Sequence, residues 1–209
     1  MKNLHNICTL KDISECKNCP INGKLICHFS SKYLISFLGF FFIFVVTAFI
    51  GVILAGYGWF LLGWIGFWLF FFEVWEIRIL CSHCPYYVEE SRTLHCIANY
   101  GSLKLWKYRP EPMSNIEKTQ LYIGFAILIG YPLGFLILGT QLVFLAVCII
   151  EIVIFFSFLI IKRCGNCVNF SCPFNRVKKE VIECFLEKNP VMRKAWEDKG
   201  YVIKGKEKP

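Results

Sequence analysis

Two long apolar stretches dominate the pattern of hydrophobic and polar positions along the chain. Residues 33–72 contain no Asp, Glu, Lys or Arg, and residues 119–161 contain a single charged residue, Glu151. An α-helix needs about 20 apolar residues to cross the roughly 30 Å of hydrocarbon in a bilayer, so each stretch is long enough for two crossings. The sequence therefore predicts an all-α integral membrane protein rather than a soluble core, because buried helices of soluble proteins are shorter.

Each apolar stretch has turn-forming residues near its middle. These are Gly56-Tyr57-Gly58 in the first stretch and Gly139-Thr140-Gln141 in the second, and glycine permits a tight reversal of the backbone. We expect four transmembrane helices, arranged as two hairpins, at about residues 33–55, 58–78, 119–138 and 142–161. The chain then divides into a cysteine-rich N-terminal segment (1–32), a first hairpin (33–80), a Cys/His loop (81–118), a second hairpin (119–161) and a cysteine-rich tail (162–209).

Basic residues flank the predicted crossings on one side, whereas the two hairpin turns carry no charge. The flanking residues are Lys32, Arg78, Lys104, Lys107, Arg109, Lys118, Lys162, Arg163, Lys178 and Lys179. By the positive-inside rule, both termini and the central loop are cytoplasmic, and the chain lies in a cell or inner membrane in contact with lipid. The net charge of +8 is explained by this topology and does not indicate a nucleic-acid partner, because no nucleic-acid-reading motif accompanies it.

Eleven of the twelve cysteines fall into three groups beside the apolar stretches. The groups are Cys8, Cys16, Cys19 and Cys27; Cys81, Cys84 and Cys96; and Cys164, Cys167, Cys172 and Cys184. A CxxC turn lets two thiolates converge on one metal ion, and cytoplasmic thiols are normally kept reduced. We therefore expect the three cytoplasmic segments to assemble into one cysteine-ligated metal domain. The central group would be completed by His95, by His83 or by a ligand from another segment.

The identity of the metal stays open between zinc and iron–sulfur. Proline follows Cys19, Cys84 and Cys172, as it follows the last cysteine of bacterial ferredoxin motifs, and this favours iron–sulfur clusters. The nearby His83 and His95 instead suit mixed Cys/His zinc sites.

Two further patterns concern the cysteines. A basic residue and a CxxC motif follow each predicted hairpin, at residues 78–84 and 162–167, which indicates either a duplicated unit or the ordinary basic end of a cytoplasmic helix. Residues 177–186 have apolar side chains at helical spacing and predict a short amphipathic helix. Cys184 on this helix is either a metal ligand or a small buried hydrophobic residue.

These patterns predict a redox protein, without an assignable catalytic residue and with enzyme activity undecided. Metal centres at the cytoplasmic face would serve electron transfer with a protein partner; no His or Met lies in the predicted helices to ligate haem, and no nucleotide motif is present. One alternative is a zinc-stabilised membrane adaptor or assembly factor. A third is a small ion or metal transporter that uses Glu151 and Cys148 in the fourth helix.

The carboxylates near the membrane also have simpler interpretations. Glu151 can be protonated and hydrogen-bonded to Tyr131 or Gln120, with Cys148 as packing. Glu76 lies near the cytoplasmic end of the second helix, where water or Arg78 can solvate it.

Overall fold

A computed structural model describes residues 7–11, 13–96 and 98–203. The regular structure of this part of the chain is helical, apart from an isolated antiparallel bridge between Thr93 and Leu103. Four segments are long and apolar enough to cross a membrane: Ser31–Leu54, Gly58–His83, Asn115–Leu138 and Leu142–Asn166. The expected all-α fold with four membrane-length helices is confirmed.

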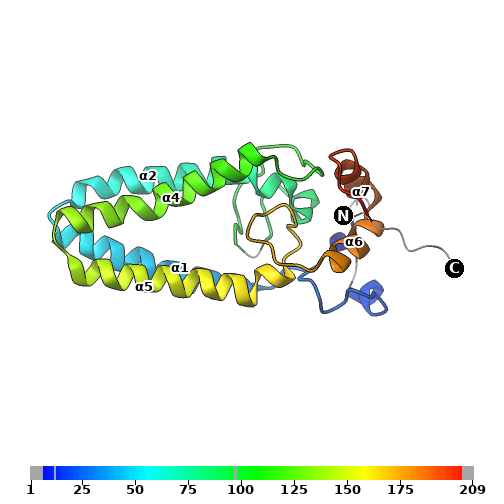
Figure 1. Cartoon of the computed structure of the whole chain (residues 1–209), viewed down its shortest axis with the longest axis horizontal. Coiled ribbons are helices and arrows are strands. Elements are labelled where there is room, and N and C mark those ends of the chain that lie inside the picture. Colours follow the sequence, from blue (N-terminus) through cyan, green and yellow to red (C-terminus); the bar gives the residue numbers. More distant parts are fainter. Residues whose placement is uncertain (1–6, 12, 97, 204–209) are drawn as a thin grey trace.

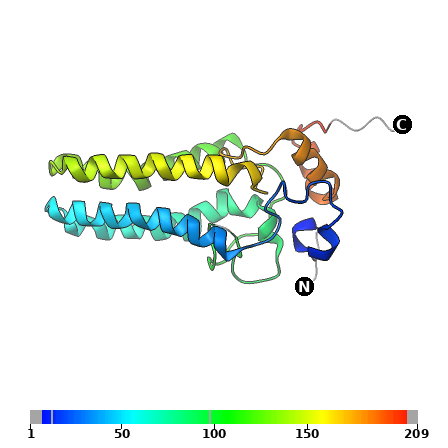
Figure 2. The same cartoon turned by 90° about the horizontal axis from the view of Figure 1, so that it is seen from below.

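The four segments pack side by side as an elongated bundle. Helix α1 (Ser31–Leu54) contacts α5 (Leu142–Lys162), and α2 (Leu61–Phe70) contacts α4 (Asn115–Leu138). Figures 1 and 2 show that the chain reverses after α1 and after α4 at the same end of the bundle. The non-membrane segments that the structure describes lie at the opposite end.

The second membrane segment is interrupted by a π-helical turn. After η3 (Gly58–Phe60) and α2, the backbone takes the π form in η4 (Phe71–Trp75) and returns to the α form in α3 (Glu76–Ile79). Such a turn inserts one extra residue into a helix. Phe71 in this turn is fully buried and lies against Gly124 of α4, where a Cβ atom would collide with the phenyl ring. The absence of a side chain at Gly124 therefore makes room for the turn.

Helix α4 begins four residues earlier than the apolar pattern indicates, because a capping box starts it. The backbone N–H of Glu117 donates to the Ser114 hydroxyl at 3.3 Å, and the backbone N–H of Ser114 donates to the Glu117 carboxylate at 2.8 Å. These two bonds satisfy backbone groups that a helix start leaves without intrahelical partners. The polar first turn of α4 thus lies beyond the apolar stretch.

The non-membrane segments share one hydrophobic core. It combines Ile7 and Leu25 from the N-terminal segment, Tyr86 from the central loop, and Phe170 and Phe185 from the tail. The tail contains two short amphipathic helices, α6 (Lys179–Glu187) and α7 (Pro190–Glu197). Helix α6 confirms the helix expected at residues 177–186, whereas α7 was not expected from the sequence.

Candidate metal sites

The CxxC motifs after the two hairpin sequences form the same local structure. Residues Cys81–His83 (η5) and Cys164–Asn166 (η7) are 3-10 turns that directly continue the second and fourth membrane segments. The residues before them have nearly equal backbone angles, with φ −119° and ψ −54° at Leu80 and φ −121° and ψ −49° at Arg163. The residues after them, Cys84 and Cys167, are both extended. The repeated motif is therefore also a repeated backbone conformation.

One cavity, which we call the N-terminal thiol cavity, is lined by all four cysteines of the first group. Its volume is about 540 Å³, and its cysteines are Cys8, Cys16, Cys19 and Cys27. Residues at the end of α5 form part of the wall. The N-terminal segment is attached there by hydrogen bonds from the Ile26 N–H to the Asn166 carbonyl at 2.7 Å and from Asn166 Nδ2 to the Lys24 carbonyl at 2.9 Å.

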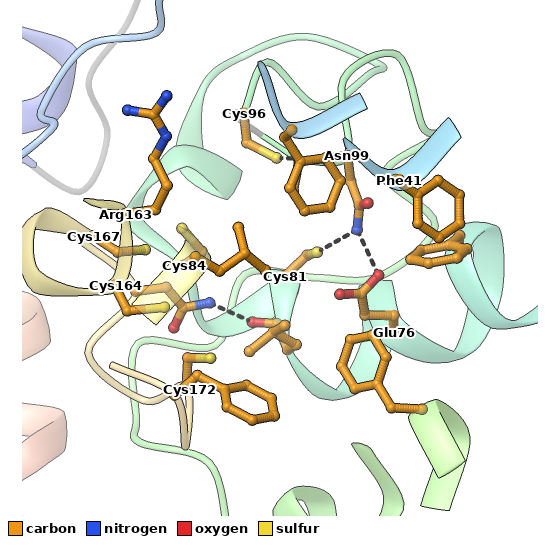
Figure 3. A pocket seen from close by; sticks show the side chains of 18 of the residues that line it. Phe41, Glu76, Cys81, Cys84, Cys96, Asn99, Arg163, Cys164, Cys167 and Cys172 are labelled. Carbon is orange, nitrogen blue, oxygen red and sulfur yellow. Dashed lines mark hydrogen bonds between the residues drawn. The ribbon is translucent and has the colours of Figure 1, made fainter. Parts of the chain in front are cut away.

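The second and third cysteine groups meet in another cavity, the central thiol cavity, of about 210 Å³. Six cysteines line it, namely Cys81, Cys84, Cys96, Cys164, Cys167 and Cys172 (Figure 3). The tail is held against the end of the second membrane segment by a hydrogen bond from Asn169 Nδ2 to the Leu80 carbonyl at 3.1 Å. The central group therefore shares its cavity with tail cysteines, and the ten cysteines of the two cavities are thiols without disulfides.

Burial governs the protonation of these thiols. Burial, together with the neighbouring thiols in the same cavity, raises the pKa of Cys27, Cys167 and Cys172 to about 12 each. Burial also raises the pKa of Cys96 to about 11. A bound cation would reverse this preference, because it stabilises the thiolate that burial alone disfavours.

A backbone N–H group hydrogen-bonds one sulfur atom of the central thiol cavity, because the Asn99 N–H donates to Cys96 Sγ at 3.0 Å. Asn99 adds a side-chain bond, because its Nδ2 donates to Cys81 Sγ at 3.2 Å. In the other cavity, Asn189 Nδ2 donates to Cys8 Sγ at 3.3 Å. Such donors favour the thiolate over the thiol.

Arg163 lies between the two cavities and lines both. Its guanidinium group stacks over the Tyr33 ring, 4.4 Å from the ring centre, and Nη2 donates to the Ser36 hydroxyl at 2.6 Å. Arginine is always charged. The protein therefore keeps a permanent positive charge in the wall between the two cavities.

Three of the residues considered as ligands stand apart from the cavity walls. His83 is fully buried, with Nδ1 at 2.6 Å from the Glu111 carbonyl and Nε2 at 3.5 Å from the Glu117 carboxylate. His95 Nδ1 lies 2.8 Å from Glu89 Oε2, and the ring packs on Tyr100. Cys184 packs against the shared hydrophobic core. His83, His95 and Cys184 do not line either cavity.

The thiols share cavities without converging on one point. Within residues 7–11, 13–96 and 98–203, no group of three or more His, Cys, Asp or Glu side chains is arranged to hold a metal ion. The side chains that line the cavities still suit a soft metal ion or a cluster, because they are thiols. Three of the sulfur atoms, those of Cys8, Cys81 and Cys96, also accept hydrogen bonds from N–H groups. Metal binding to such sites requires deprotonation of the ligands and commonly forms the site itself.

The carboxylates near the membrane have partners that the sequence did not indicate. Thr47 Oγ1 donates to Glu151 Oε1 at 2.9 Å, whereas the Tyr131 hydroxyl donates to the Phe60 carbonyl at 2.8 Å. Glu76 was expected to be solvated by water or Arg78, but it is buried and accepts a hydrogen bond from Asn99 Nδ2 at 2.9 Å. No pattern in the sequence pairs residues 76 and 99. Glu76 directly follows the π-helical turn, but the sequence does not reveal this turn and so could not mark Glu76 as a site residue.

Comparison with known proteins adds no family. No family model matches the chain, and no curated protein or solved structure shows significant similarity to it.

Proposed function

We propose that this chain is a membrane-anchored electron-transfer protein whose cysteines hold metal centres, with iron–sulfur clusters favoured over zinc. One observation carries the proposal. Two cysteine groups far apart in the sequence line one cavity, and Asn99 donates hydrogen bonds to two of its sulfurs, Cys81 Sγ and Cys96 Sγ. An iron–sulfur cluster supplies one-electron chemistry and is commonly held by four Cys thiolates. The proposed ligands in the central thiol cavity are Cys84, Cys96, Cys167 and Cys172.

The preference for iron–sulfur over zinc rests on the hydrogen bonds to sulfur. N–H donors at the ligand sulfurs, together with burial, help to set the reduction potential of such clusters. Zinc has no redox chemistry and needs only four ligands in a closed site. The central thiol cavity offers six thiols and lies next to the permanent charge of Arg163, which compensates part of the negative charge of a thiolate-bound cluster.

The proposal includes a cytoplasmic location for the thiol end of the bundle, with two hairpins crossing the membrane. The basic residues of the chain lie in the segments at the thiol end of the bundle. The turns at residues 55–57 and 139–141, at the other end, carry no charge. The positive-inside rule then assigns the thiol end to the cytoplasm. Thiols there stay reduced and available to a metal.

Metal analysis of the protein purified anaerobically in detergent tests the proposal. We expect iron with a matching amount of acid-labile sulfide, and a visible sulfur-to-iron charge-transfer band. Cys84→Ser should remove the metal of the central thiol cavity. Cys148→Ser is the matched control, because Cys148 is a buried cysteine on neither cavity wall. Zinc without sulfide, or unchanged iron in Cys84→Ser, would contradict the proposal.

A zinc-stabilised adaptor or assembly factor is the second candidate. The N-terminal thiol cavity favours it, since four cysteines are the ligand set of a closed structural zinc site. In that case a chelator would unfold the non-membrane segments, because binding free energy of a structural metal is folding free energy. Loss of helical and tertiary circular dichroism after chelation of colourless, zinc-containing protein would support this candidate.

A further inference from the structure

The central thiol cavity extends from the thiols into the interior of the membrane bundle. Its walls there come from all four membrane segments and are almost entirely apolar, with aromatic rings from each of them. Phe41 of α1, Phe72 of η4, Phe125 of α4 and Phe155 of α5 are examples. One continuous cavity thus has sulfur atoms at one end and phenyl rings at the other (Figure 3).

Two buried polar side chains lie where the apolar and thiol parts of the cavity meet. Glu76 is 5% exposed and Asn99 is 8% exposed. Asn99 Nδ2 donates both to Glu76 Oε2, at 2.9 Å, and to Cys81 Sγ, at 3.2 Å. A carboxyl and a carboxamide therefore stand within one hydrogen-bond network that ends on a thiol of the central cavity (Figure 3).

The cavity has the size and surface of a site for an apolar ring. Its volume of about 210 Å³, which the thiol end and the apolar end share, exceeds the ~150 Å³ of an engineered apolar cavity that stays dry and binds benzene. Ligand sites are typically apolar cavities with a few polar groups that fix orientation. An acyl chain would need no polar partner, whereas Glu76 and Asn99 offer hydrogen-bonding groups to an oxygen on a ring.

We propose that this cavity binds the ring of a lipid-soluble quinone, with a ring oxygen at Glu76 and Asn99. The apolar walls suit the ring. A protonated Glu76 carboxyl can donate to a quinone carbonyl, and Asn99 Oδ1 can accept from the hydroxyl group of the quinol, because both side-chain N–H groups of Asn99 already have acceptors. This inference deepens the proposed electron-transfer function and rests on it for the choice of a redox-active ligand. It concerns binding only.

Equilibrium dialysis of the anaerobically purified full chain in detergent against a tritiated short-chain naphthoquinone tests the inference. We expect saturable binding of one molecule per chain. Ile129 lines the cavity, and Ile129→Trp should fill it and weaken binding by about tenfold or more. Ile127→Trp is the matched control on the same helix, because Ile127 is 40% exposed and lines neither cavity. Ile129→Ala, which leaves the cavity open, should retain binding.

Metal analysis of the same samples separates the inference from the proposed function. Quinone binding that Ile129→Trp abolishes, in protein without iron, would support the quinone site and contradict the metal proposal. Iron and sulfide without saturable quinone binding would support the metal proposal and contradict the quinone site. Equal binding by Ile129→Trp and Ile127→Trp, or displacement of the quinone by a saturated fatty acid at the same concentration, would overturn the quinone site.

Discussion

Asn99 connects three groups of the central thiol cavity. Its side chain donates to Glu76 and Cys81, and its backbone N–H donates to Cys96 Sγ at 3.0 Å. Asparagine has two side-chain N–H groups on one nitrogen, so it can serve two acceptors at once. A single residue thereby holds a membrane carboxyl in place beside two thiols.

Replacement of Asn99 by Leu should destabilise the protein by about 1–3 kcal/mol, the cost of leaving a buried polar partner without its hydrogen bond. Thermal unfolding in detergent, followed by circular dichroism, measures the change. The double variant Glu76→Leu/Asn99→Leu removes both partners and should be more stable than Asn99→Leu alone. A double variant that is less stable by the sum of the two single effects would contradict an interaction between these side chains.

Cys172 and Cys184 are the last two cysteines of the chain, and their surroundings differ. Cys172 lines the central thiol cavity, whereas Cys184 packs against the core of the non-membrane segments. Cys172→Ser should therefore lose the metal of that cavity, and Cys184→Ser should keep its full metal content. Metal per chain, measured on both purified variants, gives the comparison. Equal losses would make Cys184 a ligand.

At the scale of elements, helix contacts in the bundle depend on particular glycines. A Cβ atom at Gly124 would collide with the Phe71 ring in the π-helical turn, whereas a Cβ atom at Gly130 on the same helix would meet nothing within 4 Å. Small residues permit close approach of membrane helices. Gly124 therefore fixes how α4 meets the second membrane segment.

Gly124→Ala should destabilise the bundle by about 1–3 kcal/mol, since overpacking forces side chains and backbone to shift. Gly130→Ala adds the same methyl group to the same helix without a clash and should leave the stability unchanged or slightly higher. Thermal unfolding of the two variants in the same detergent decides between them. Equal midpoints would mean that the turn around Phe71 relaxes freely.

The sequence was sufficient to predict the long helices, because absence of charge over 20 or more residues is a signal contained in each segment itself. Shorter elements were harder to predict from the sequence. Helix α7 spans only Pro190–Glu197, and its buried Met192 and Trp196 are a single pair at helical spacing. The π-helical turn depends on packing against Gly124, which no local pattern encodes.

The candidate site was predictable in its residue types but not in its grouping. CxxC spacing identified the thiols, yet the meeting of Cys84 with Cys167 depends on the tertiary contact between Asn169 and Leu80. Asn99 was not considered, and Arg163 was interpreted only as a basic residue at the end of a membrane helix. Neither a lone asparagine nor a basic residue at a helix end differs in sequence from many others that only meet solvent.

At the scale of the whole molecule, the described segments that carry the cysteines other than Cys148 lie at one end of the bundle (Figures 1 and 2). The turns at residues 55–57 and 139–141 lie at the other end. The proposed thiol chemistry would therefore take place at one end of the bundle.

A reporter fused to each end of the bundle should reveal its orientation. Green fluorescent protein fused after residue 209 should fluoresce, and alkaline phosphatase fused there should be inactive, if the thiol end is cytoplasmic. Alkaline phosphatase fused after Gly139, at the uncharged end, should be active. The opposite pattern would invert the topology and make disulfides the expected state of the thiols.

The wall of the N-terminal thiol cavity also sets an order of events during biosynthesis. The last of the four cysteines in this cavity is Cys27, but the cavity is bounded in part by Asn166 of η7, which is synthesised 139 residues later. At translation rates of about 5–20 residues per second, this delay is roughly 7 to 28 s. The first cysteines made are therefore without this part of their cavity wall during that interval.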